Sequence, residues 1–223
     1  MYNNTMVKGI LFDMDGTLTD RRASAYDCYC ACVGQMCDYD PLTQERIVQE
    51  LMIWDQYGYV NKREVWEKLR DKHFPTLDID YWTKYWYDNF HRYQRLMPSC
   101  LEVLDDLHKD YKLGIVTNGA HESQMAKVKS LGLHEHVDIV VTEGGFGMGK
   151  PDSGIFVHAC SLLGLLGKET AFVGDMFPTD IYGAMAAECH PIWMCHDQRI
   201  VSNYAIKTIC GLKELRGVLE ELL

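Results

Sequence analysis

The sequence predicts an α/β protein with a doubly wound, Rossmann-like parallel-sheet core and an inserted four-helix cap subdomain. Three observations support this fold class: an apolar run ends at Phe12, helical patterns alone fill the next stretch, and strand and helix patterns alternate from Ser99 onward. Strands that alternate with helices favour a parallel sheet covered on both faces. We therefore expect residues 1–20 and 97–223 to form the α/β core and residues 21–96 to form the cap.

Short apolar runs bounded by polar or turn residues predict the strands of the core. They cover residues 7–12, 113–117, 137–142, 171–174 and 191–195. Helical patterns that begin near residues 99, 119, 153, 180 and 212 predict the helices between and after these strands. The first of them starts with a capping-box pattern, Ser99 to Glu102.

Four helical patterns follow one another in the cap, at residues 23–37, 43–57, 61–73 and 80–96. The cap is also rich in aromatic side chains, which could stack on a nucleobase or pack inside the helical bundle. Aromatic residues at helical spacing are typical of a packed interior, so we favour the second interpretation. These residues are Trp54, Tyr57, Tyr59, Trp66, Tyr81, Trp82, Tyr85, Trp86, Tyr87, Phe90 and Tyr93.

The composition excludes several classes of partner. The chain has 223 residues, of which 47% are hydrophobic, and a formal net charge of −10, which argues against nucleic acid or an anionic membrane. No apolar run is long enough to span a bilayer, and the first residues lack the pattern of a signal peptide. The nine cysteines form no Cys-x-x-Cys pair, so we expect reduced thiols in a cytoplasmic protein.

Two aspartates, Asp13 and Asp15, follow the first predicted strand and precede a turn at Gly16. Side chains alternate along an extended strand, so both carboxylates would point the same way at its carboxyl end. Open α/β sheets bind their ligands at this edge. Two carboxylates this close repel each other unless a cation or a shared proton relieves them. A bare Asp-x-Asp is usually only an acidic turn, so the rest of the chain decides its meaning.

Polar groups follow three further predicted strands, and the carboxyl ends of parallel strands meet at one edge of the sheet, so all of them should converge. Carboxylates are hard oxygen ligands that suit Mg²⁺, while turn N–H groups, a hydroxyl and a lysine suit phosphate oxygens. The set therefore predicts phosphoryl chemistry. The groups are Asp13 and Asp15, Thr117 and Asn118, Thr142 with the glycine-rich loop to Lys150, and Asp175 with Asp180.

These segments resemble, in order, the four motifs of the haloacid dehalogenase-like (HAD) hydrolase superfamily. The branch is the one with a helical cap after the first motif, similar to phosphoglycolate phosphatase and β-phosphoglucomutase. A lone Asp-x-Asp is weak evidence, but four motifs in order are specific. The match runs from about residue 7 to residue 187, and the cap matches by position and helical character only. The motifs span residues 13–20, 117–119, 147–152 and 174–181.

The resemblance implies a Mg²⁺-dependent phosphatase that hydrolyses a small phosphorylated metabolite through an aspartyl-phosphate. A sugar phosphate or a nucleoside monophosphate is the expected substrate. Asp13 would be the nucleophile, and Asp15 the general acid and then the base. The Asp13 carboxylate, the Asp15 backbone carbonyl and the Asp175 carboxylate would hold Mg²⁺.

The resemblance also assigns the remaining polar groups. Lys150 would bind the phosphoryl oxygens and stabilise the transition state. Asp180 would orient Lys150 or a metal-bound water, or it could cap the helix that it opens, or both. The substrate would also be bound by Gly16, Thr117, Asn118 and Gly119.

Related chemistries on the same core remain as alternatives. A phosphomutase would keep all four motifs, whereas a dehalogenase would not need Asp15 or Asp175. Loss of Asp13, Asp15 or Lys150 would indicate a non-catalytic phospho-ligand-binding protein, and all three are present. Arg21 and Arg22 could meet a substrate anion or be solvated hinge charges. A phosphonatase would need a cap lysine that forms an imine, for which the candidates are Lys62, Lys68, Lys72 and Lys84.

Overall fold

The computed structural model describes residues 6–197, 199–200 and 205–222. The chain divides into two compact units: residues 20–95 form the cap unit, and the chain before and after them forms the core unit. Each boundary lies one residue from the expected one. Among the helices that the structure describes, none combines the length and apolarity needed to cross a bilayer.

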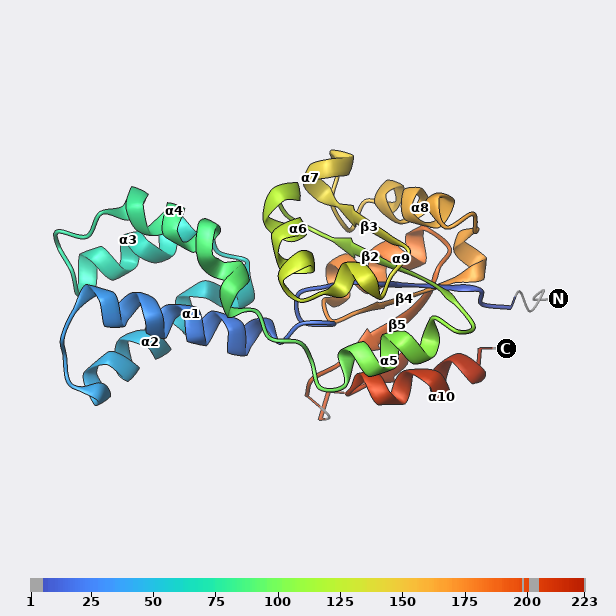
Figure 1. The fold of residues 1–223 in the computed structure, drawn as a ribbon, viewed down its shortest axis with the longest axis horizontal. Helices are drawn as coiled ribbons and strands as arrows, with labels where there is room; N and C mark the ends of the chain where they lie inside the picture. The colour runs from blue at the N-terminus through green and yellow to red at the C-terminus, as the bar shows by residue number, and fades with distance from the viewer. Residues whose placement is uncertain (1–5, 198, 201–204, 223) are drawn as a thin grey trace. The chain divides into compact units, whose positions relative to one another are not determined.

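The core unit contains a six-stranded sheet in the order β3–β2–β1–β4–β5–β6 (Figure 1). Every neighbouring pair is parallel, and the order is that of the doubly wound Rossmann fold, so the predicted fold class is confirmed. The short β6 was not predicted, because three residues carry too little pattern. The strands are β1 (Gly9–Phe12), β2 (Lys112–Thr117), β3 (Ile139–Thr142), β4 (Thr170–Gly174), β5 (His190–Met194) and β6 (Lys207–Ile209).

Helices cover both faces of this sheet (Figure 1). One face packs against α5, α6 and α10, and the other packs against α8 and α9. Side chains of β1 alternate between the two layers: Ile10 and Phe12 lie in the first and Leu11 in the second, all fully buried. The helices are α5 (Cys100–Leu107), α6 (His121–Ser130), α7 (Glu143–Phe146), α8 (Ser153–Leu162), α9 (Tyr182–Ala186) and α10 (Leu215–Glu220).

Two local predictions for the core unit are wrong. Ser99 has a φ of 59° and makes no side-chain capping bond, so the expected capping box is not formed. The left-handed backbone at Ser99 differs from the extended conformation that an N-cap residue typically adopts. The glycine-rich segment after β3 is not entirely a loop, because it contains the one-turn helix α7, whose start is capped by the Thr142 hydroxyl.

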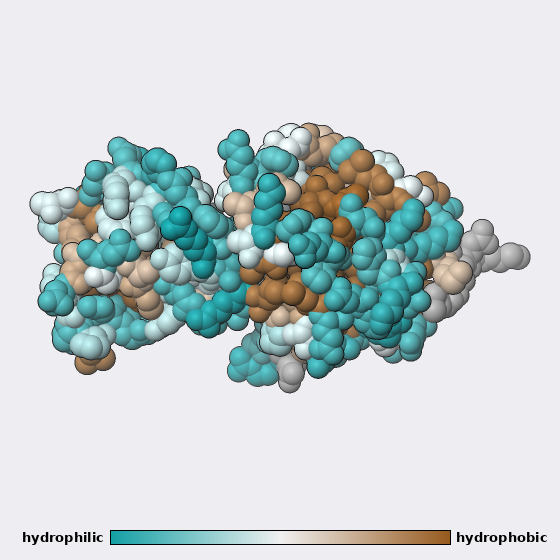
Figure 2. All heavy atoms as spheres, viewed as in Figure 1, coloured by the Kyte–Doolittle hydropathy of each residue, from teal (hydrophilic) through white to brown (hydrophobic). Residues whose placement is uncertain are grey.

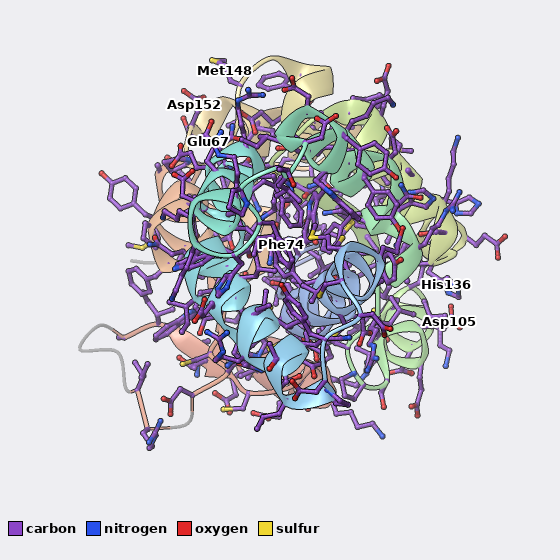
Figure 3. All side chains as sticks on the ribbon, turned by 90° about the vertical axis from the view of Figure 1, so that its left-hand side faces the viewer. Glu67, Phe74, Asp105, His136, Met148 and Asp152 are labelled. Carbon is purple, nitrogen blue, oxygen red and sulfur yellow. The ribbon has the colours of Figure 1, made fainter. Side chains whose placement is uncertain are left out.

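A contact between a histidine and an aspartate on the surface of the core unit links α5 to the turn that follows α6. The Nδ1 atom of His136 lies 2.5 Å from a carboxylate oxygen of Asp105, and Figure 3 labels both residues on the same side of the molecule. Exposed pairs of this kind contribute little to stability. The layer packing described above therefore holds the core unit together.

The cap unit contains four α-helices, as predicted: α1 (Arg21–Met36), α2 (Pro41–Asp55), α3 (Lys62–Lys72) and α4 (Ile79–Asn89). The fourth helix was expected to reach residue 96, but it ends at Asn89 and a 3₁₀ turn follows at Phe90–Tyr93. The Asn89 side-chain amide donates to the Tyr85 carbonyl at 2.9 Å. It thereby competes with the backbone for a helical carbonyl.

The cap aromatics that are buried form its packed interior. Trp66, Trp82, Trp86 and Phe90 are each at most 8% exposed, and they lie in one apolar cluster with Tyr29. This agrees with the packed-interior interpretation for these residues. On the face drawn in Figure 2, hydrophilic side chains cover much of the cap unit. Within the cap unit, the aromatic residues that are more than half exposed are Tyr57, Tyr59, Tyr81 and Tyr87.

A group of charged residues, here termed the cap cluster, is buried among these aromatics. Asp55, at the end of α2, is 1% exposed and accepts a hydrogen bond from the Tyr29 hydroxyl at 2.9 Å. Arg21 Nη1 lies 2.9 Å from the same carboxylate, and Lys62 also forms an ion pair with it. Arg21 is therefore a paired, largely buried cation and not a solvated hinge charge.

Candidate active site

Four of the strands end at one edge of the sheet, where they bring distant motifs together. The register pairs Phe12 of β1 with Ile115 of β2 and with Val173 of β4. The next residue, Asp13, donates its backbone N–H to the Val173 carbonyl at 2.8 Å, which fixes its position beside β4. Thr117 is the last residue of β2 and lies opposite the last residue of β3. The predicted convergence of these strand ends is therefore observed.

Lys150 lies between two carboxylates at the centre of this edge. Its Nζ is 2.5 Å from Asp13 Oδ1 and 2.8 Å from Asp180 Oδ1, and all three residues are buried. Burial alone would lower the pKa of Lys150, but the charges of Asp13 and Asp180 outweigh it and raise that pKa. Lys150 therefore carries a fixed positive charge next to Asp13.

Three carboxylates surround this single ammonium group. Oxygens of Asp13, Asp175 and Asp180 lie within 4.8 Å of one another, and together with Lys150 we term them the core cluster. Burial raises the pKa of Asp13 to about 7, and burial followed by the charge of Asp13 raises the pKa of Asp175 to about 8. Asp175 Oδ1 is buried without a hydrogen-bond partner among the described residues. Hard oxygen donors with surplus negative charge fit a divalent cation such as Mg²⁺.

Asp180 does not cap the helix that follows it. It lies inside a π-helical turn at Phe177–Ile181, and α9 begins two residues later. Its carboxylate accepts a bond from the backbone N–H of Met176 at 2.9 Å, in addition to the ion pair with Lys150. Its side chain lies so close to Gly174 that a Cβ at that glycine would lie 2.4 Å from the Asp180 Cβ. Asp180 thus holds both Lys150 and its own loop.

The turn after Asp15 depends on Gly16. This glycine has a φ of +96°, and a Cβ there would lie 2.3 Å from Asp175 Oδ2, so only glycine fits. The Gly16 carbonyl also pairs with His196 Nε2 at 2.7 Å. The first motif is therefore packed tightly against the fourth.

Asn118 and Gly119 make different contacts from those expected of phosphate ligands. The Asn118 side chain donates to the Lys150 carbonyl at 2.9 Å and accepts from the Lys150 N–H at 2.7 Å, so it joins the second motif to the third. The Gly119 N–H donates to Glu143 Oε2 at 2.8 Å. Substrate binding by these two residues stays a prediction, and it would use the Asn118 backbone and not its side chain.

Two further residues at the site were missed by sequence reasoning. Lys127 Nζ lies 2.5 Å from Asp15 Oδ2, and Gln124 Nε2 lies 3.3 Å from the same oxygen. Gln124 also donates to the Thr117 hydroxyl at 3.0 Å. Both belong to α6, and both are at most 7% exposed. The signal in the sequence is a pair of long polar residues three positions apart on a helix that must cover the sheet.

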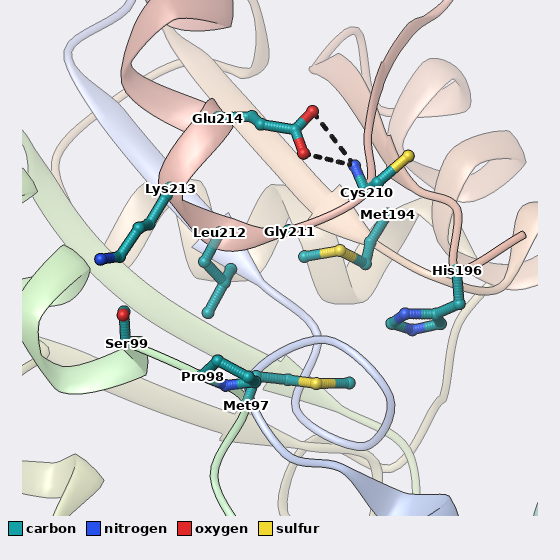
Figure 4. A pocket seen from close by; sticks show the side chains of 10 residues that line it. All are labelled: Met97, Pro98, Ser99, Met194, His196, Cys210, Gly211, Leu212, Lys213 and Glu214. Carbon is teal, nitrogen blue, oxygen red and sulfur yellow. Dashed lines mark hydrogen bonds between the residues drawn. The ribbon is translucent and has the colours of Figure 1, made fainter. Parts of the chain in front are cut away.

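A separate pocket of about 260 Å³ lies elsewhere in the core unit (Figure 4). Its walls are formed by residues 97–99, Met194, His196 and residues 210–214, and it contains none of the aspartates described above. Two of its residues touch the first motif: His196 contacts the Gly16 carbonyl, and the Met97 N–H donates to the Leu18 carbonyl at 2.8 Å. The candidate site residues at the sheet edge, Asp13, Lys150, Asp175 and Asp180, therefore lie outside this pocket.

The family model of haloacid dehalogenase-like hydrolases matches residues 7–188 of this chain. The chain belongs to this family. The matched range contains all four motifs and every candidate site residue, so the resemblance inferred from the motifs is confirmed.

Individual relatives agree with the predicted class of enzyme. The glyceraldehyde 3-phosphate phosphatase of Methanothermobacter thermautotrophicus is 31% identical over 187 residues, which are 82% of this chain and 83% of that protein. The N-acylneuraminate-9-phosphatase of Mus musculus is 30% identical over 120 residues, which are 51% of this chain and 48% of that protein. These two relatives of the HAD-like hydrolase support a phosphoric monoester hydrolase.

A solved structure agrees with the fold. The HAD-hydrolase YfnB of Bacillus subtilis, bound to magnesium, superposes with a TM-score of 0.77 at 20% identity, over 96% of this chain and 99% of that one. At this identity the likeness concerns the fold alone. The HAD-like hydrolase and this relative therefore share the arrangement of sheet and helices on which the site is built.

Proposed function

We propose that this HAD-like hydrolase is a Mg²⁺-dependent phosphatase that acts on a small phosphorylated sugar metabolite. The observation that carries the proposal is the core cluster, in which Asp13 is buried 2.5 Å from Lys150 and shares its surroundings with Asp175 and Asp180. Three carboxylates and one ammonium group leave surplus negative charge. A divalent cation would balance this charge and leave the site able to accept an anionic phosphate.

The oxygen donors of the core cluster would hold the cation. Asp13, Asp175 and the backbone carbonyl of Asp15 would be its ligands, and Asp180 would act through a bound water. When bound, Mg²⁺ supplies the positive charge that lets an anionic carboxylate approach an anionic phosphate. The unpartnered Asp175 Oδ1 supports this assignment, because a buried oxygen without a donor is otherwise unfavourable.

The chain's own residues would carry out the reaction in two steps. In the first, an Asp13 oxygen bonds to phosphorus as the bond to the leaving oxygen breaks, and Asp15 donates a proton to that oxygen. In the second, Asp15 takes a proton from water, the water oxygen bonds to phosphorus, and Asp13 is released with inorganic phosphate. Lys150 and the Thr117 hydroxyl would stabilise the phosphoryl oxygens in both steps.

The relatives narrow the class of substrate. Glyceraldehyde 3-phosphate and N-acylneuraminate 9-phosphate, which the names of two relatives contain, are both phosphate esters of a terminal hydroxyl on a polyhydroxy carbonyl compound. We extend this chemistry to the present chain. The alcohol part of such esters would leave as an alkoxide, which is a poor leaving group and needs a proton from a general acid, and Asp15 would supply it.

The test is release of inorganic phosphate from a panel of phosphomonoesters. The panel contains triose and sialic acid phosphates, nucleoside monophosphates and an aryl phosphate, each assayed with Mg²⁺ and with chelator. We expect chelator-sensitive turnover, fastest on the sugar esters, and a loss of at least ~10³-fold in Asp13→Asn, since removal of a covalent nucleophile has effects of this size or larger. Absence of release from every ester by folded, Mg²⁺-loaded protein would contradict the proposal.

A further inference from the structure

We propose that Lys127 is a positioning residue that holds the Asp15 carboxylate for proton transfer to the leaving group. The inference rests on the proposed phosphatase function and adds a residue outside the four motifs. Its basis is the contact between Lys127 Nζ and Asp15 Oδ2 at 2.5 Å.

The burial of Lys127 indicates a specific role. Lysine is almost never buried unless it is paired, and Lys127 is 7% exposed. Two residues along the same helix, Lys129 is exposed. Helix α6 therefore presents one lysine to the interior of the core unit and one to solvent, and the interior one meets the carboxylate of Asp15.

Lys127 and its neighbour Gln124 act on one oxygen of Asp15. Gln124 lies three positions earlier on the same face of α6, and its Nε2 approaches Asp15 Oδ2 at 3.3 Å and Thr117 Oγ1 at 3.0 Å. Asp15 Oδ1, in contrast, has a longer contact of 3.4 Å with the Thr19 hydroxyl. Because two donors from α6 hold Oδ2, Oδ1 would be the Asp15 oxygen that gives a proton to the leaving group.

This arrangement predicts which step depends on Lys127. Departure of an alkoxide needs a proton from Asp15, whereas departure of p-nitrophenolate needs almost none, because that anion is stable by itself. The ratio kcat/KM reports the steps up to and including departure of the leaving group, because formation of the aspartyl-phosphate is then irreversible. Misplacement of Asp15 should therefore lower kcat/KM for alkyl esters selectively.

The experiment measures kcat/KM of the Mg²⁺-loaded full chain on glyceraldehyde 3-phosphate and on p-nitrophenyl phosphate. Lys127→Met is the test variant, and Lys129→Met is the matched control on the exposed side of the same helix. For Lys127→Met we expect a loss of about 10²-fold or more on the alkyl ester and less than about 5-fold on the aryl ester, since general acid catalysis contributes factors of this order. Lys127→Arg should recover part of the alkyl activity, and Lys129→Met should match the wild type.

Several outcomes would overturn the inference. Equal losses on both esters by folded Lys127→Met would show a general effect on the site, and unchanged rates on both would show that Asp15 needs no such support. If Lys127→Met does not fold, Lys127→Gln replaces it, with the same criterion. Absence of turnover in the wild type would overturn the proposed function itself, and the inference with it, so the two failures are distinguishable.

Discussion

The two units of this HAD-like hydrolase each bury a charged cluster, and the two clusters have opposite compositions. The core cluster has three carboxylates around one ammonium group, Lys150, whereas the cap cluster has two cations, Arg21 and Lys62, around one carboxylate, Asp55. The cap cluster is surrounded by aromatic rings, with Lys62 Nζ 4.7 Å from the centre of the Trp86 ring. The faces of these rings attract cations, so they stabilise the excess positive charge of the cap cluster.

The core cluster has no comparable means of dispersing its surplus charge. Burial raises the pKa values of Asp13 and Asp175, and the charges of neighbouring carboxylates raise them further. A buried cluster whose excess charge is not stabilised by neighbouring side chains is typical of a ligand-binding site. A buried cluster whose excess charge is stabilised by its neighbours is typical of a structural role. The comparison therefore separates a binding cluster from a structural one, and the predictions below test that separation.

The largest expected effect follows from removal of the central cation of the core cluster. Lys150→Met should lower turnover by at least ~10³-fold, because transition-state charge loses its fixed partner. It should also destabilise the metal-free protein at about pH 8 more than at about pH 5, where the carboxylates retain protons. Phosphate release and thermal unfolding at both pH values measure this, and equal destabilisation at both would contradict it.

The next effect concerns the carboxylate of the cap cluster. Asp55→Asn removes the buried carboxylate that pairs with Arg21 and Lys62, which should cost about 3–5 kcal/mol. Tryptophan fluorescence during urea unfolding reports this change well, since four of the five tryptophans lie in the cap unit. The matched control is Asp71→Asn, whose carboxylate is 67% exposed and should change stability by less than about 0.5 kcal/mol. Similar urea midpoints for Asp55→Asn and Asp71→Asn would contradict a structural role of the cap cluster.

A smaller effect is the pH dependence of stabilisation by Mg²⁺. Asp13 and Asp175 titrate near 7 and 8 in the folded protein, against an ordinary pKa of 3.8. Between these values the folded protein holds protons that the unfolded chain releases, so stability of the metal-free protein falls as pH rises. Mg²⁺ binds the ionised form, so its stabilisation should rise with pH, to about 2–3 kcal/mol at about pH 8 with Mg²⁺ in ~100-fold excess over Kd. Thermal melts with Mg²⁺ and with chelator measure this, and a shift that does not change with pH would contradict it.

The smallest effect is expected from Lys62→Met in the cap cluster. The variant keeps the pair between Arg21 and Asp55 and replaces a buried cation by an apolar side chain of similar length. Because Asp55 keeps Arg21 as a counter-charge, no buried charge is left uncompensated, so we expect a change within about 1 kcal/mol and normal turnover. The same substitution at Lys150 should be far more damaging, and similar effects at the two positions would make the two clusters equivalent.

Much of the core unit is predictable from sequence, because the motif residues stand directly after buried apolar runs. Asp13 follows β1, Thr117 ends β2 and Asp175 follows β4, so parallel pairing alone brings them together. The roles of the motif residues stay predictions that rest on the resemblance. The strand β6 and the one-turn helix α7 are too short to carry a periodic signal.

The contacts that sequence reasoning did not reach are all tertiary. Lys127 has no feature in the sequence that distinguishes it from other helix residues, and only the packing of α6 against the sheet brings it to Asp15. The two residues are 112 positions apart in sequence. Asp55 and Arg21 likewise carry no local pattern that marks them as partners. Side-chain pairing across elements depends on packing, which hydrophobic periodicity does not specify.

The junction between the two units has a consequence for engineering. In the core unit, Thr19 and Leu96 form an antiparallel bridge, and the Met97 N–H donates to the Leu18 carbonyl at 2.8 Å. The two ends of the insertion are thus already tied together by the scaffold that receives it. The first and last residues of the insertion at residues 20–95 therefore lie close together. A short turn could replace the insertion without separating the paired segments, because closing a short gap costs little loop entropy. The fold therefore contains a natural exchange point, at which one inserted helical unit can be removed and another inserted while the strands that carry the motifs keep their register.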